Sequence, residues 1–175
     1  MPRPATYMLK FIKNWNDPQN SQLALLRDGK EVVSYRAGSG KDFDRNECSS
    51  GAGWLPGGPY RIAGHMTDRG ADARPWNEPA VQGYVIQLAD KVCMPVSGQK
   101  AVNRTELFIH SETKADGTQG FSIFEDDSLR RWEDERDDKS SGCIKLHPDR
   151  PDHIKDLFRH LDRAGRPTNL TLDVG

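Results

Sequence analysis

Apolar and polar residues alternate in several short segments of the chain, which is the pattern of half-buried β-strands. One further segment predicts a hairpin, because Asp28-Gly29 stands between two apolar runs and a type I′ turn needs positive φ at both central positions. The predicted strands lie at residues 6–13, on both sides of Asp28-Gly29, and at 60–64, 83–89, 106–111 and 168–174. Loops are predicted at the Gly-, Ser- and Pro-rich residues 37–59 and at 66–80, and Pro95 and Gly98 mark a turn.

A single segment has clear helical periodicity. Its apolar residues are spaced i, i+3, i+4 and i+7, and they are Ile154, Leu157, Phe158 and Leu161. Pro151 suits a first turn, and Gly165 and Pro167 favour an end, so a helix is expected over 151–164. Many short strands with one good helix predict a mainly β (α+β) fold. The length of 175 residues favours a single domain over residues 1–175.

The charge balance provides no general electrostatic attraction to nucleic acid. Lys and Arg total 25, Asp and Glu total 26, and the formal net charge is −1. No apolar run approaches the roughly 20 residues that cross a bilayer, so no membrane span is expected. The N-terminal residues 1–15 contain no uninterrupted apolar stretch, and we expect no secretory signal in this chain.

Three cysteines stand far apart, at positions 48, 93 and 143. An odd number leaves at least one thiol outside any intramolecular disulfide. Cys48 and Cys93 would be the pair in an oxidising compartment, and two thiols are an equally good interpretation of the sequence. No zinc-type spacing of cysteines and histidines is present, and we expect no metal site.

The segment around Cys143 is a candidate nucleophile. Small residues precede it in Ser140-Ser141-Gly142-Cys143, and the Gly142 and Cys143 amides are suited to hold an oxyanion. His110 closes the apolar strand LFIH and would be the base that takes the thiol proton. His65 closes RIAGH in the same way, so residue type does not choose between the two histidines. A buried structural cysteine and a structural histidine are the alternative interpretation.

The pair LFIHS…SSGCIKL resembles the signature of the YkuD-type L,D-transpeptidases, and WLPGGPYRI (54–62) is similar to their TPxGxYxI segment. The resemblance covers about residues 22–150. It implies a YkuD-like β-sandwich with one C-terminal amphipathic helix and a short helical insertion before the catalytic cysteine. It also implies that Cys143 is the nucleophile and His110 the base, that a backbone carbonyl at Ser111 orients the histidine, and that Gly142 contributes to the oxyanion hole.

Four residues are expected to bind substrate, namely Ser141, Lys145, Tyr60 and His65. Ser141 stands where many members of the family have a second histidine, and Lys145 replaces the usual arginine. His110 and Cys143 are separated by 33 positions, which exceeds the usual gap and indicates an insertion at about residues 123–139. This acidic segment is expected to be a solvated helical excursion, and the alternative interpretation is a lid or a partner-facing surface that affects the choice of substrate.

The resemblance implies a peptidoglycan L,D-transpeptidase of the cell envelope or periplasm, or a secreted one. It would act on stem tetrapeptides through a cysteine thioester, giving 3→3 cross-links or D-amino acid exchange, without a cofactor and with acylation by carbapenems. L,D-carboxypeptidase activity and a secreted antibacterial effector held off by an immunity protein use the same site. A non-catalytic module that binds the wall or a protein partner is the alternative from another class.

Overall fold

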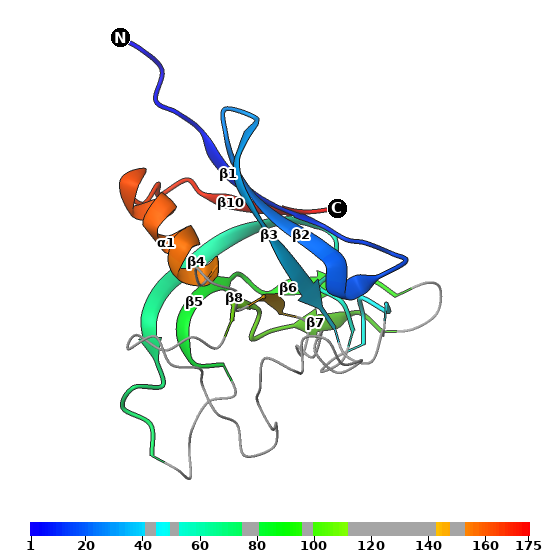
Figure 1. Ribbon diagram of the computed structural model, residues 1–175. Coiled ribbons are helices and arrows are strands. Elements are labelled where there is room, and N and C mark those ends of the chain that lie inside the picture. The colour runs from blue at the N-terminus through cyan, green and yellow to red at the C-terminus, as the bar shows by residue number, and fades with distance from the viewer. Residues whose placement is uncertain (41–44, 50–52, 75–80, 96–99, 112–142, 148–152) are drawn as a thin grey trace.

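Over the residues that the structure describes, the fold is a closed eight-stranded β-barrel with one α-helix, seen here in a computed structural model (Figure 1). The structure describes residues 1–40, 45–49, 53–74, 81–95, 100–111, 143–147 and 153–175. Around the barrel the strands follow the order β1-β10-β4-β5-β8-β9-β3-β2. Their bounds are β1 Tyr7–Ile12, β2 Ser21–Arg27, β3 Lys30–Ser39, β4 Gly58–Arg69, β5 Gly83–Leu88, β8 Phe108–His110, β9 Ile144–Leu146 and β10 Thr171–Val174.

The expected β-sandwich is therefore replaced by a barrel. The reason is that β1 pairs with β10 on one side and with β2 on the other, so the sheet has no open edge between two layers. The mainly β class and the C-terminal helix are confirmed. The predicted helical insertion at 123–139 lies outside the described residues.

The hairpin between β2 and β3 forms where the sequence predicts it. Asp28 has a φ of 51° and Gly29 a φ of 78°, as a type I′ turn requires. The turn lies at the top of Figure 1, at the opposite end of β3 from Ser39. β3 continues from there and pairs with β9, with Ser39 opposite Ile144. The hairpin thus leads the chain directly to the strand that follows Cys143.

β4 is longer than the sequence analysis predicts. The expected strand over 60–64 continues to Arg69, through residues that were expected to form a loop. Pairing with β5 carries it on, across register shifts between Ile62 and Gly64 and between Met66 and Arg69. His65 therefore lies within a strand and does not close one.

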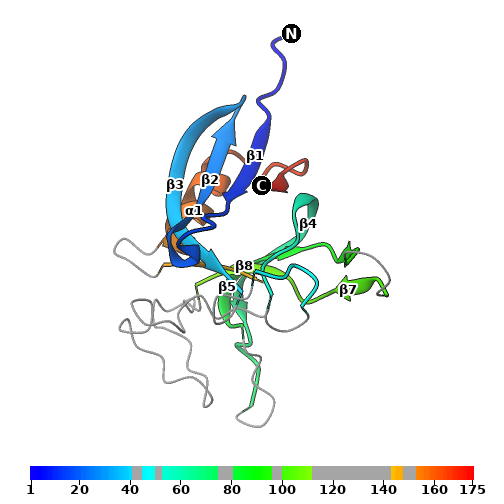
Figure 2. The ribbon, with the colours of Figure 1, turned by 90° about the vertical axis from the view of Figure 1, so that its right-hand side faces the viewer.

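A second, small sheet was not predicted. It consists of β6, Lys91–Cys93, and β7, Val102–Arg104, which pair in antiparallel fashion beside the barrel (Figure 2). Each strand is only three residues long, which is too short for a periodic pattern to show. The sheet has a role in the site, because it carries Cys93 and Arg104.

The helix α1, His153–Arg163, and the single 3₁₀ turn η1, Pro18–Asn20, complete the described elements. The four apolar side chains predicted for the helix are buried, and they join the main core with residues from the barrel strands. The helix reaches two sides of the barrel, because Asp156 accepts a hydrogen bond of 2.7 Å from Tyr35 on β3 while Phe158 packs on Tyr84 of β5. In the described part of the chain, no helix has the length and apolar character needed to cross a membrane.

Candidate active site

Cys143 lies immediately before β9 and is 3% exposed. Ile109 is opposite Ile144 in the parallel pair β8–β9, so Cys143 falls beside Phe108. The thiol packs with Phe108 and Val85 in a small cluster separate from the main core, and its Sγ is 3.5 Å from the carbonyl oxygen of Glu106. Strand alternation explains the separation, since the neighbouring Ile86, Ile109 and Ile144 face the barrel interior.

His110, the last residue of β8, is on the same face as Cys143. It stands two positions after Phe108 and lies opposite Lys145, which stands two positions after Cys143. The two candidate residues are thus diagonal neighbours on adjacent parallel strands. A strand spacing of about 4.8 Å and a two-residue rise of about 6.6 Å place their α-carbons roughly 8 Å apart. Both ring nitrogens of His110 are buried, and neither has a hydrogen-bond partner within the described part of the chain.

The carbonyl contact expected from Ser111 is therefore not made in this structure. Ser111 follows His110 directly and is 1% exposed, so it is placed where the resemblance puts it. An imidazole without that bond has no fixed tautomer, and either nitrogen is able to accept a proton.

Burial determines the charge state of the pair. It raises the pKa of the Cys143 thiol to about 11, although a hydrogen bond from the Phe108 backbone N–H and the charges of two nearby arginines oppose this. Burial, and then the charges of Lys145 and Arg69, lower the pKa of His110 to about 3. At neutral pH the site therefore holds a neutral thiol beside a neutral imidazole. Such a pair generates a thiolate only when the proton moves to the imidazole.

Lys145 is 9% exposed and lies on β9, opposite His110 and opposite Gly38 of β3. Its charge is thus part of the same face as the thiol and the imidazole. The expected role of Lys145 in binding substrate stays a prediction. A lysine there supplies a point charge rather than the planar fork of an arginine.

Tyr60 and His65 are placed away from this face. Tyr60 is 3% exposed, belongs to the main core and donates a 2.7 Å hydrogen bond from its hydroxyl to the carbonyl oxygen of Pro56. His65 lies opposite Ile86, whose side chain faces the interior, and its ring is 6.0 Å from that of Phe158 on α1. The strand alternation thus separates both residues from Cys143. Ser141 and Gly142 lie outside the described residues.

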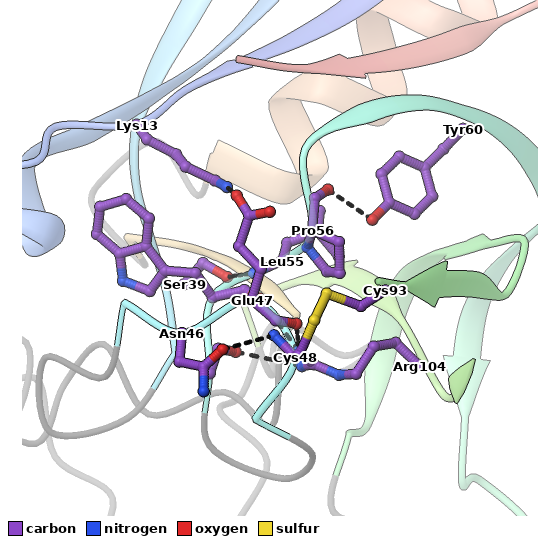
Figure 3. Close-up of polar contacts among 12 residues, drawn as sticks. Lys13, Ser39, Asn46, Glu47, Cys48, Leu55, Pro56, Tyr60, Cys93 and Arg104 are labelled. Carbon is purple, nitrogen blue, oxygen red and sulfur yellow. Dashed lines mark hydrogen bonds and ion pairs between the residues drawn. A yellow bond between two sulfur atoms is a disulfide. The ribbon is translucent and has the colours of Figure 1, made fainter. Parts of the chain in front are cut away.

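A framework beside the small sheet fixes the chain that enters β4. Cys48 and Cys93 form a disulfide, with their Cα atoms 5.3 Å apart (Figure 3). Arg104, 2% exposed, donates hydrogen bonds to the carbonyl oxygens of Glu47, of Gly53 at 3.2 Å and of Trp54 at 3.3 Å. The sequence left the state of the two cysteines open, and the structure joins them.

This framework reaches the candidate site from the side of β3. The backbone N–H of Leu55 donates a 3.0 Å hydrogen bond to Oγ of Ser39, the residue opposite Ile144. Arg104 also contributes one of the positive charges that act on the Cys143 thiol. Trp54, whose carbonyl oxygen accepts from Arg104, is itself 1% exposed.

Arg69 is a residue near the site that the sequence analysis missed. It ends β4, and its guanidinium carbon lies 4.5 Å from the ring centroid of Phe108, the side chain beside Cys143. No motif marks it, because it stands in a segment that was expected to be a loop. Only the register of β4 against β5, with Arg69 opposite Gly83, brings it there.

Comparisons with known proteins give structural neighbours and no sequence relative. No protein-family model matches the chain, and no curated protein matches its sequence. A cysteine-to-serine mutant of Enterococcus faecium L,D-transpeptidase is similar in structure, with a TM-score of 0.44 and 14% identity, over 99% of this chain and 50% of that one. L,D-transpeptidase 1 of Mycobacterium tuberculosis has a TM-score of 0.39 and 13% identity, over 96% and 62%.

An L,D-transpeptidase from Mycobacterium smegmatis has a TM-score of 0.41 and 13% identity, over 95% of this chain and 58% of that one. The chain therefore spans between half and about three fifths of the length of these solved structures. At these identities and TM-scores the likeness assigns no role to any residue.

Proposed function

We propose that the protein is a cysteine-dependent acyltransferase of the L,D-transpeptidase type, with Cys143 as nucleophile and His110 as base. The observation that carries the proposal is the parallel register of β8 and β9. It puts a buried thiol and a buried imidazole on one face of adjacent strands, and leaves both imidazole nitrogens without a hydrogen-bond partner among the described residues. A structural histidine in a core would use its nitrogens in hydrogen bonds.

The reaction follows from the neutral resting pair. The Cys143 sulfur attacks the carbonyl carbon of the donor peptide bond while its proton passes to His110. The tetrahedral intermediate collapses to a thioester as His110 returns the proton to the leaving amine. An acceptor amine then attacks the thioester and the thiol is restored. Water in place of the amine gives the hydrolytic reaction of a carboxypeptidase.

The proposed substrate is a peptidoglycan stem tetrapeptide, as the similarity of the segments around His110 and Cys143 to the YkuD-type enzymes implies. The proposed location is the cell envelope or the outside of the cell. The disulfide supports this location, because disulfides persist in oxidising compartments and are rare in the cytosol. The effector alternative shares this location and this site.

Mass spectrometry of muropeptides tests the proposal. Purified protein is incubated with sacculi rich in tetrapeptide stems, and the products are digested and weighed. Cross-linked dimers indicate transpeptidation, a changed terminal residue indicates exchange, and tripeptides indicate hydrolysis. Cys143→Ala is expected to abolish all three products, while Arg27→Gln, at the far end of the β2–β3 hairpin, retains them. Products from Cys143→Ala would refute the mechanism, and the absence of any product from the unaltered protein would favour the non-catalytic module.

A further inference from the structure

The guanidinium of Arg69 lies over the ring of Phe108, which packs against the candidate nucleophile. Phe108 and Cys143 pack in one cluster, and Arg69 covers the Phe108 ring at 4.5 Å. Its Nη1 donates a hydrogen bond to the carbonyl oxygen of Val81, which fixes the orientation of the plane. The side chain of Arg69 is 21% exposed, so part of it faces solvent.

The guanidinium of Arg69 forms an ion pair with a carboxylate of the protein itself. Oε2 of Glu106 lies 3.6 Å from Nη2 of Arg69, and the Glu106 side chain is 75% exposed. An exposed pair of this kind is weak, because water and salt screen it. The backbone of the same Glu106 accepts the Sγ contact of Cys143, at 3.5 Å. The carboxylate that Arg69 holds thus belongs to a residue that contacts the thiol.

We propose that Arg69 is an anion-binding residue of the acyl-donor site, and that Glu106 fills it until a substrate carboxylate takes its place. The planar guanidinium presents five N–H donors in a fork that matches a carboxylate. The Glu106 carboxylate shows which chemical group fits there. Because this pair is weak and exposed, its exchange for a second carboxylate costs little.

This inference rests on the proposed function and narrows its substrate class. It assigns to the site acyl donors that carry a free carboxylate on the Arg69 side of the attacked carbonyl. Lys145 on β9, opposite His110, is a second cation of the proposed site. A neutral donor of equal size gains no binding energy from Arg69.

Two alkylating reagents of nearly equal size test the inference without a peptide substrate. Iodoacetate is an anion and iodoacetamide is neutral. With either one the Cys143 sulfur bonds to the methylene carbon, iodide leaves with its electron pair, and the thiol proton goes to buffer. The readout is the ratio of the two second-order rate constants for the adduct on Cys143, measured by mass spectrometry. Access to the buried sulfur and its thiolate fraction affect both reagents alike and cancel in the ratio.

Arg69→Gln is expected to lower the ratio of iodoacetate to iodoacetamide about fivefold, and Arg69→Lys is expected to change it much less. Glu106→Gln is expected to raise the ratio roughly threefold, because Arg69 is then open to the anion. In the double variant Arg69→Gln/Glu106→Gln the ratio should equal that of Arg69→Gln alone. The control Arg27→Gln removes a charge at the far end of the hairpin and should leave the ratio unchanged.

The double variant distinguishes binding of the anion at Arg69 from a general change in the electrostatic potential around the thiol. If Glu106→Gln raises the ratio equally in the presence and absence of Arg69, the two effects are additive and the exchange is refuted. An unchanged ratio in Arg69→Gln, with the fold verified by circular dichroism, also refutes it. If neither reagent labels Cys143 in the unaltered protein at any pH, the thiol mechanism of the proposed function fails instead.

Discussion

Removal of the Cys48–Cys93 disulfide is predicted to cost about 4 kcal/mol of unfolding free energy. The two cysteines are separated by 45 positions, and closing a loop of this size in the unfolded chain gives that figure from chain entropy at 25 °C. With an unfolding entropy of about 2.1 cal/mol/K per residue, a chain of 175 residues loses about 11 °C of Tm.

The perturbation is the double variant Cys48→Ala/Cys93→Ala in a Cys143→Ala background, so that no thiol is left to exchange. Alanine is preferred to serine because Cys93 is only 7% exposed, so a serine at this position would bury a hydroxyl group. The native loop should survive, since Arg104 still donates to the carbonyl oxygens of Gly53 and Trp54. The decrease in unfolding free energy is therefore expected to come from the greater conformational entropy of the unfolded chain and not from lost native contacts.

Thermal unfolding followed by circular dichroism, with and without dithiothreitol, measures the effect. The reductant should lower the Tm of the Cys143→Ala parent to that of the triple variant, and it should leave the triple variant unchanged. A Tm difference below about 3 °C would contradict the chain-entropy reasoning. An equal effect of reductant on both proteins would show that the disulfide is not its target.

Three further predictions concern the buried polar groups. Burial lowers the pKa of His110 to about 3, against an ordinary value of 6.5, so below pH 6.5 the unfolded chain binds a proton that the folded protein does not, and the folded state loses stability as pH falls. In urea unfolding the unaltered protein should therefore lose about 2 kcal/mol more unfolding free energy than His110→Asn between pH 6.5 and 5. Since the pKa of Cys143 is raised to about 11, its alkylation by iodoacetamide should accelerate about tenfold per pH unit from pH 8 to 10, and a rate independent of pH there would instead indicate a preformed thiolate. Arg104→Met should cost about 3 kcal/mol in urea unfolding because three carbonyl oxygens lose a charged donor, and a loss below 1 kcal/mol would refute that role.

The helix and the first hairpin were predictable because local chemistry determines them. The apolar stripe from Ile154 to Leu161 and the turn at Asp28-Gly29 each need only a few neighbouring residues. The closure of the barrel was not predictable, because β1 pairs both with β2, its neighbour in sequence, and with β10, which lies near the other end of the chain. The extension of β4 to Arg69 was missed for the same reason, since pairing with β5 overrides its polar sequence.

The sequence predicts Cys143 and His110 as the central pair of the candidate site, and their roles stay a prediction, whereas their surroundings could not be predicted. Cys143 and His110 stand in recognisable segments, and β8 and β9 bring them to one face. Strand alternation decided the rest, and the sequence did not reveal it: His65 faces α1, and Tyr60 lies in the core. Arg69 and the Cys48–Cys93 bond depend on contacts between distant segments, which no local pattern encodes.

The parallel pairing of β8 and β9 has a consequence for how this protein tolerates change. Backbone hydrogen bonds of the barrel, with Ile109 opposite Ile144, set the relative position of His110 and Cys143 along the two strands. Substitutions that keep this pairing therefore leave the two residues on the same face. A change that shifts the register by one residue turns one of them to the opposite face of the sheet.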